Sequence, residues 1–424
     1  MKKLALHWKI LIGMGLGIFF GVAMSFINSG PDFIKDYIKP FGTLFINLLK
    51  LIAVPLILAS LIKGISDLKD ISKLSQMGGR TIVIYLLTTL TAVSIGLVLV
   101  NIIQPGKSIS VETRQELVEA YASDTQEKQE AAAKQRESGP LQPLVDLVPS
   151  NIFEAVADNR NMLQVIFFAL FFGIGMILLP EATTQPVKGF FDSFNAVILK
   201  LIDLIMLSAP YGVFALLAAL VVEAPSLELF QALALYAITL LLGLAIMIVV
   251  YIVIVRVFTN RSPAFFMKGM APAQLLAFST SSSAATLPVT MECVEGKLGV
   301  DEEVASFVLP IGATINMDGT SVYQGVAAVF IAQAFGLDLS LSAQIGIVFT
   351  ATLASIGTAA VPSAGIVMLV IVLAQAGIPE AGLALIFAID RPLDMCRTIV
   401  NVTGDAAVSM IVGKSIGKLK DQPN

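Results

Sequence analysis

Long, predominantly apolar runs limit the fold of this 424-residue chain more than any other feature of its sequence. A run of about 20 apolar residues can cross the hydrocarbon core of a bilayer as an α-helix. Backbone groups find no water inside a bilayer, so a spanning segment must be a helix or part of a closed barrel. The hydrophobic share of 56% and the mean hydropathy of +0.85 fit this class. We therefore predict an all-α polytopic membrane protein, with runs near 8–28, 41–66, 80–103, 160–180, 187–220 and 228–257.

Basic residues predict which side of the membrane each loop faces. Lysine and arginine concentrate in the cytoplasmic loops of membrane proteins. Here they flank the first run, separate the second from the third, follow the sixth and close the chain, so we expect both termini in the cytoplasm. They are Lys2, Lys3, Lys9, Lys63, Lys69, Lys73, Arg80, Arg256, Arg261, Lys268, Lys414, Lys418 and Lys420. The charged segment 106–140 is then an extracellular loop, either a solvated helix or disordered.

Two similar small-residue stretches break the apolar pattern in the last third of the chain. They are FSTSSSAATLPVT at 278–290 and ATLASIGTAAVPSAG at 351–365. Each precedes a helix with polar groups at mid-depth: the Asn-Met-Asp-Gly-Thr stretch at 316–320, and a charged final segment. One such run would favour tight helix packing, and 316–320 alone could be a polar kink. The matched pair instead favours a transporter binding site, with unwound backbone offering carbonyls to a hard cation.

The final apolar segment, roughly 380–412, carries ionisable residues of both signs. Each costs about 2.5–3.5 kcal/mol at mid-membrane on insertion scales, so we expect them to serve a ligand. At about 100° per residue, positions 390, 394, 397, 398, 401 and 405 share one helix face. This face suits a small zwitterionic or dicarboxylic ligand together with a cation. The planar guanidinium of Arg397 can grip a carboxylate at two points, whereas Asp390 and Arg391 are expected to satisfy structural partners.

The balance of buried charge predicts coupled cations. Asp318, Asp390, Asp394 and Asp405 outnumber Arg391 and Arg397 by two. An acidic amino acid adds one more negative charge, so roughly three monovalent cations should bind with it if all the acids stay ionised.

Other functional classes fit the sequence less well. The single histidine, His7, lies in the N-terminal tail and argues against a histidine metal site or relay. No HExxH or GxSxG motif occurs, and the Ser281–Ser283 run has no histidine partner, so we do not expect an enzyme. Cys293 and Cys396 lack CxxC spacing and are interpreted as packing residues. A channel would need a continuous polar lining, whereas the polar residues here cluster at one depth.

Four motifs together give the chain a family resemblance: SSSAATLP, GATINMDGTSVYQG, ASIGTAAVP and DMCRTIVNVTGD. With them, nearly the whole chain from residue 38 onward resembles the dicarboxylate/amino acid:cation symporters, or glutamate transporter family, in its bacterial or archaeal form. The resemblance implies eight transmembrane helices, two re-entrant hairpins and a homotrimer in the plasma or inner membrane. It also implies a scaffold domain at 1–79 and 141–225, and a transport domain at 80–105 and 226–424 that moves like an elevator.

The resemblance also implies roles for individual residues. Arg397 would hold the side-chain carboxylate of an acidic amino acid, and Asp394 its amino group. The remaining substrate positions would be Ser281, Ser282, Ser283, Thr320, Val361, Gly365, Thr398 and Asn401. Sodium, as the co-transported ion, would occupy three sites. The first would use Gly312, Asn316, Asn401 and Asp405; the second Thr314, Met317, Ser355, Ile356 and Thr358; the third Tyr85, Thr88, Thr89, Asn316 and Asp318.

Departures from the family pattern bear on substrate and coupling. Archaeal members carry arginine at the position of Ser281, and mammalian members carry it at Met395. This chain has neither, but it has Arg391, which the bacterial C4-dicarboxylate branch shares. That branch lacks an acid at Asp394, so an amino acid substrate is expected, with a proton- or sodium-coupled C4-dicarboxylate symporter as the alternative. Gln324 replaces a mammalian glutamate linked to proton and potassium coupling, so we expect sodium coupling without that proton route.

Overall fold

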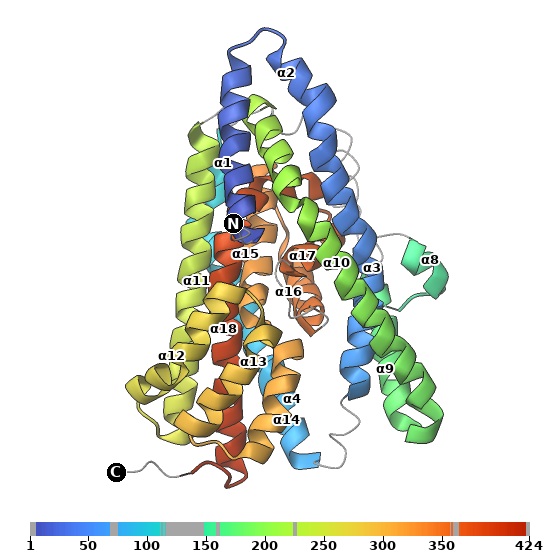
Figure 1. The fold of residues 1–424 in the computed structure, drawn as a ribbon, viewed down its shortest axis with the longest axis vertical. Coiled ribbons are helices and arrows are strands. Elements are labelled where there is room, and N and C mark those ends of the chain that lie inside the picture. The colour runs from blue at the N-terminus through green and yellow to red at the C-terminus, as the bar shows by residue number, and fades with distance from the viewer. Residues whose placement is uncertain are drawn as a thin grey trace, which may run out of the picture.

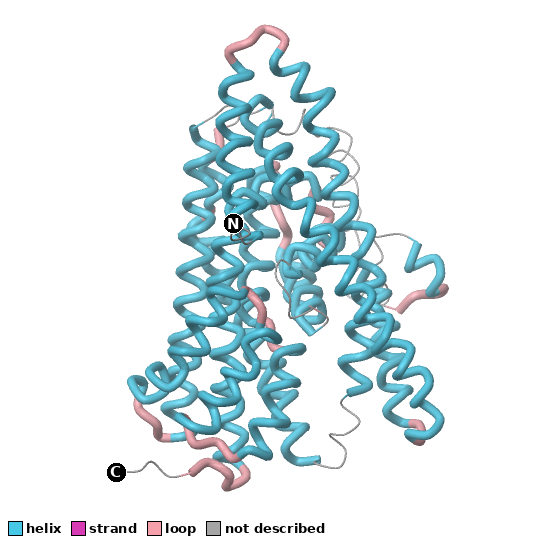
Figure 2. Tube along the Cα trace, in the orientation of Figure 1, coloured by secondary structure: helices cyan, strands magenta, loops and turns pink. Residues whose placement is uncertain are grey.

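The chain folds almost entirely into helices. The computed structural model describes residues 6–67, 75–110, 112, 115, 148–157, 162–223, 227–356, 358 and 364–420. Figure 2 shows short loops between long helices, and the described residues contain no strand beyond one isolated bridge. The predicted all-α class is therefore confirmed. The loop at 106–140 lies mostly outside the described residues.

Four described helical stretches are long and apolar enough to cross a membrane: Trp8–Ser25, Met77–Ser108, Glu228–Thr259 and Ile389–Ser415. A fifth arises if the bent pair Glu181–Ile202 and Leu207–Ala219 counts as one span; the bend is 47°. Proline cannot donate to the carbonyl one turn earlier, and Pro210 lies just after this bend. These lengths and compositions are those of a membrane protein.

One group of helices packs through close backbone contacts. It comprises α1 (Leu6–Ser25), α3 (Lys39–Asp67), α9 (Met162–Leu178) and α10 (Glu181–Glu223), together with the short α2 (Gly30–Phe33) and α8 (Ile152–Ala157). Gly13, Gly17 and Gly21 of α1 lie so close to the backbone of α10 that a Cβ on any of them would collide with it. Small residues spaced by four let two membrane helices approach closely, so this spacing joins α1 to α10.

A second group of helices packs around the final helix and its neighbour, the helix at Asp318–Ala334 (Figure 1). Its members are α4 (Ser75–Ile103), α11 (Leu227–Thr259), α12 (Pro263–Thr280), α13 (Ser283–Glu292), α14 (Glu302–Ile315), α15 (Asp318–Ala334), α16 (Leu341–Ile356), α17 (Ala364–Gln375) and α18 (Leu383–Ser415). Although α18 carries the charged segment, most of its side chains are buried by these neighbours. The charged face is therefore turned into protein.

The predicted breaks occur, with one difference in extent. Helices α12 and α13 contact each other and meet at Ser281, which adopts a left-handed backbone conformation (φ 52°). Helix α16 ends at Ile356 and α17 begins at Ala364. Between α14 and α15 only Asn316 and Met317 are non-helical, because α15 already begins at Asp318. The unwound stretch is thus shorter than the predicted 316–320.

The C-terminal segment is fastened to the loop that precedes α14. Val300 and Leu419 form an antiparallel bridge. The Lys420 N–H donates to the Gly299 carbonyl at 2.8 Å, and the Asp301 N–H donates to the Lys418 carbonyl at 3.0 Å. We call residues 416–420 the C-terminal strap. It connects the end of α18 to residues 299–301, which lie between α13 and α14.

Candidate substrate and cation site

The start of α15 packs directly onto the middle of α18. A Cβ at Gly319 would collide with the carbonyl oxygen of Arg397, so only glycine allows this approach. The Gly319 N–H donates to Oδ1 of Asn401 at 2.8 Å. The helix break before Asp318 therefore brings free backbone groups against the charged face of α18.

Arg397 is fully buried at this junction, with none of its surface exposed. Its Nη2 donates to Asp390 and to Asp394, both at 2.9 Å. Its guanidinium carbon lies 3.8 Å from the ring centroid of Tyr323, a cation–π contact. Nε and Nη1 have no hydrogen-bond partner among the described residues. Because buried donors without partners are costly, these nitrogens indicate a place for an anionic ligand.

Asp394 is held by two arginines. Its Oδ1 accepts from Arg397, and its Oδ2 accepts from Nη1 of Arg391 at 3.2 Å. One turn later, Thr398 donates its hydroxyl to the backbone carbonyl of Asp394 at 2.9 Å. Asp390, for which a structural partner was expected, forms an ion pair with Arg397 at 2.9 Å.

The start of α17 covers the free side of Arg397. A Cβ built on Gly365 would lie 3.6 Å from Nη1 of Arg397 and 2.9 Å from the methyl group of Thr320. Nη1 of Arg397 therefore lies beside the start of α17, and the start of α17 also contacts Thr320 of α15. The structure thus brings together four of the predicted substrate residues, Thr320, Gly365, Asp394 and Arg397.

A second cluster, rich in oxygen, lies one to two turns further along α18. The Asn316 amide donates to Oδ1 of Asp405 at 2.9 Å and to the Asn401 carbonyl at 3.3 Å. A Cβ at Gly312 would collide with both the Tyr85 hydroxyl and Asp405. Oδ1 of Asn316 is buried without a partner. Carboxylate, amide, hydroxyl and carbonyl oxygens are the ligands that hard cations prefer.

Asp318 forms a third buried cluster with residues from other helices. Its Oδ1 accepts from the Thr89 hydroxyl at 2.7 Å, and its Oδ2 accepts from the Tyr251 hydroxyl. Thr89 is a predicted ion-site residue, whereas Tyr251 was not predicted. The sequence signal for Tyr251 is a polar hydroxyl in a mainly apolar helix, and α11 carries other polar residues such as Tyr236 and Thr239.

The other predicted residues have different surroundings. Ser282 caps α13 by accepting from Ala285, and the buried hydroxyls of Ser281, Ser283 and Ser355 have no partner within the described part of the chain. Met317 accepts from the Asn401 amide through its sulfur at 3.3 Å. The hydroxyls of Thr88, Thr314 and Thr358 donate to backbone carbonyls of their own segments, and their oxygen lone pairs are not used by these bonds. Val361 and the side chain of Ile356 lie outside the described residues.

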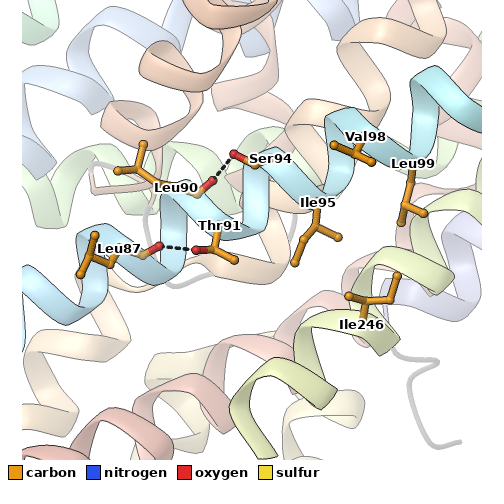
Figure 3. Close-up of a pocket in the computed structure, with 8 residues that line it drawn as sticks. All are labelled: Leu87, Leu90, Thr91, Ser94, Ile95, Val98, Leu99 and Ile246. Atoms are coloured by element: carbon orange, nitrogen blue, oxygen red, sulfur yellow. Dashed lines mark hydrogen bonds between the residues drawn. The ribbon is translucent and has the colours of Figure 1, made fainter. Parts of the chain in front are cut away.

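Neither a metal-ligand cluster nor the groove between α4 (Ser75–Ile103) and α11 (Leu227–Thr259) adds a further site among the described residues. Among the described residues, no group of three or more His, Cys, Asp or Glu side chains could hold a metal ion. A groove of about 540 Å³ lies between α4 and α11. Figure 3 shows that its lining is aliphatic and that its two hydroxyls, on Thr91 and Ser94, bond to their own helix. Nothing there would bind a charged substrate.

Comparisons with known proteins identify the family of the chain. The chain matches the sodium:dicarboxylate symporter family over residues 6–415. It is 34% identical to the proton/sodium-glutamate symport protein of Bacillus caldotenax, covering 100% of this chain and 97% of the relative. It is 34% identical to the proton/glutamate-aspartate symporter of Escherichia coli K12 (97% and 93%), and 37% identical to mouse excitatory amino acid transporter 3 (98% and 87%). The expectation of a transporter and not an enzyme is confirmed, and the chain belongs to the sodium:dicarboxylate symporter family.

Proposed function

We propose that this protein takes up acidic amino acids, L-aspartate and/or L-glutamate, in symport with several sodium ions. The observation that carries the proposal is Arg397, a fully buried guanidinium with two unpartnered nitrogens. An arginine in this state is suited to a carboxylate, because charge-assisted hydrogen bonds compensate for its lost hydration. In this proposal Arg397 binds the side-chain carboxylate of the substrate.

The acid beside Arg397 supports an amino acid over a plain diacid. Asp394 accepts from Nη2 of Arg397, which also donates to Asp390. The remaining lone pairs of the Asp394 carboxylate can accept from a substrate ammonium group. A diacid such as succinate has no ammonium, so it would leave that carboxylate facing an anion. The hydroxyls of Thr320 and Thr398, the Asn401 amide and the serines at 281–283 would supply further polar contacts around the bound molecule.

Buried acids support coupling to cations. Asp405 and Asp318 have no basic partner among the described ion pairs, and each lies among neutral oxygens and amides. Burying uncompensated carboxylates is costly, so cations that bind there would stabilise the loaded state. The named relatives from Bacillus caldotenax and Escherichia coli are called proton/sodium and proton symporters. We assign sodium here because the Asp405 carboxylate, the Tyr85 hydroxyl and Oδ1 of Asn316 gather neutral and anionic oxygens, which hard cations prefer.

The packing of the helices supports an elevator mechanism. The site lies wholly within the group around α18, whereas α1, α3, α9 and α10 pack mainly on one another. We propose that the former group is the transport domain and the latter the scaffold of a trimer. In this scheme α12–α13 and α16–α17 are re-entrant hairpins, eight helices span the cell or inner membrane, and both termini are cytoplasmic.

Uptake by proteoliposomes tests the function. We expect saturable uptake of labelled L-aspartate that requires an inward sodium gradient, with strong competition by L-glutamate or D-aspartate and weak competition by succinate. Unchanged uptake after sodium is replaced by choline would refute sodium coupling. Equal competition by succinate would instead favour the C4-dicarboxylate symporter.

A further inference from the structure

Arg391 is an ionic residue for which the proposed substrate chemistry gives no direct role. Its side chain is 11% exposed, and its Nη1 lies 3.2 Å from Oδ2 of Asp394. Its Nε is buried without a partner among the described residues. It lies on α18, the same helix as Arg397. We infer that Arg391 is a positioning residue that fixes the Asp394 carboxylate and so keeps Arg397 available to the substrate.

The geometry of Asp394 carries this inference. Each of its oxygens accepts from a different arginine, Oδ1 from Arg397 and Oδ2 from Arg391. The plane of the carboxylate is therefore set by two anchors. A carboxylate held only by Arg397 could turn and accept from it at two points, which is the preferred geometry of an arginine–carboxylate pair. Asp394 would then occupy donors that an incoming substrate carboxylate needs.

Charge balance points the same way. Asp390 and Asp394 face Arg391 and Arg397, so these four side chains are neutral together. Loss of Arg391 leaves a net negative charge beside a site that is proposed to bind an anion. In a poorly solvated place that charge is weakly screened, so it repels the ligand. Both effects lower affinity without contact between Arg391 and the substrate; the positioning effect acts through Asp394, whereas the charge effect is present in any background.

The contact also predicts how substitutions behave. Arg391 reaches Asp394 through a single nitrogen, and a lysine ammonium can replace one such contact. Arg391→Lys should therefore keep L-aspartate affinity within about threefold, whereas Arg391→Gln should weaken it roughly tenfold or more. The maximal uptake rate should fall less than the affinity. Arg256→Gln is the matched control, because Arg256 is exposed and bonds only a backbone carbonyl on its own helix end.

A double-variant cycle tests the route of the effect. Affinity for L-aspartate in saturating sodium is measured for the wild type, Arg391→Gln, Asp394→Asn and the double variant. Since the positioning effect acts through Asp394, adding Arg391→Gln to Asp394→Asn should weaken affinity by only about threefold, against roughly tenfold when Arg391→Gln is made in the wild type. The double variant also restores local neutrality, which guards against misfolding.

Several results would overturn the inference. Unchanged affinity in Arg391→Gln, a Lys variant as weak as the Gln variant, or the same loss in the Asp394→Asn background would each contradict it. The inference rests on the proposed function, but the two fail differently. If the wild type binds no L-aspartate, the proposed function fails; if the wild type binds and Arg391→Gln binds equally well, only the role of Arg391 fails.

Discussion

Replacing Arg397 by methionine should separate its structural role from its binding role. Arg397 is fully buried and bonds Asp390 and Asp394, each at 2.9 Å. Removing one partner of a buried ion pair costs about 3–5 kcal/mol, because the remaining charge is left without compensation. The same change removes the guanidinium that binds the substrate. Two charge-assisted hydrogen bonds at about 1.5–3 kcal/mol each correspond to a loss of roughly 150-fold or more in affinity.

A compensating variant distinguishes these two losses. Adding Asp390→Asn to Arg397→Met removes the orphaned charge, while Asp394 keeps its ion pair with Arg391. Thermal stability should then recover most of what Arg397→Met lost, but binding of L-aspartate should not. The assay is thermal unfolding of the purified protein together with calorimetric titration of L-aspartate in sodium. If Arg397→Met bound L-aspartate within about threefold of the wild type, or if the double variant regained affinity, our account of Arg397 would be wrong.

Three further substitutions test other parts of the structure. Asp394→Asn should move preference from L-aspartate toward succinate, measured as the ratio of their inhibition constants; an unchanged ratio would contradict the ammonium role. Gly312→Ala places a methyl group against Asp405, so the sodium concentration for half-maximal uptake should rise about tenfold, and an unchanged sodium dependence would exclude a cation there. Val300→Ala, at the bridge to Leu419, should cost about 1.6 kcal/mol for two methyl groups and leave L-aspartate affinity unaltered; unchanged stability would show that the buried Val300 side chain does not help to hold the C-terminal strap.

The charged face of α18 was predictable because helical geometry fixes which side chains share a face. Asp394, Arg397, Asn401 and Asp405 are all buried, as the spacing of this face predicts for charges that the membrane could not accept. The breaks at 281 and 316 were predictable for a related reason, since small and hydroxyl-rich residues interrupt an otherwise apolar pattern. Both signals are local in the sequence.

Partners from distant helices could not be predicted in the same way. Tyr251 donates to Asp318 across 67 positions, and the ring of Tyr323 lies over Arg397 from a different helix. An isolated tyrosine in an apolar run is compatible with many packings, so the sequence alone did not single out either residue. The pairing of Val300 with Leu419 was missed for the same reason, because neither segment has a strand pattern.

The different contacts that Arg391 and Arg397 make with Asp394 could not be predicted from the sequence either. Spacing places residues 391 and 394 three apart on the helix, where an ion pair is possible. It does not reveal that Asp394 shares its two oxygens between Arg391 and Arg397. That arrangement depends on how α15 and α17 enclose Arg397, which is a property of tertiary packing.

Equilibrium binding of L-aspartate to the purified protein at increasing sodium, with choline maintaining ionic strength, tests the central claim most directly. Buried carboxylates at Asp318 and Asp405 need cations before an anionic substrate can be held at Arg397. The apparent Kd should therefore fall steeply as sodium rises, with more than one sodium ion taken up per substrate. An apparent Kd that stays constant from choline to sodium would contradict the account.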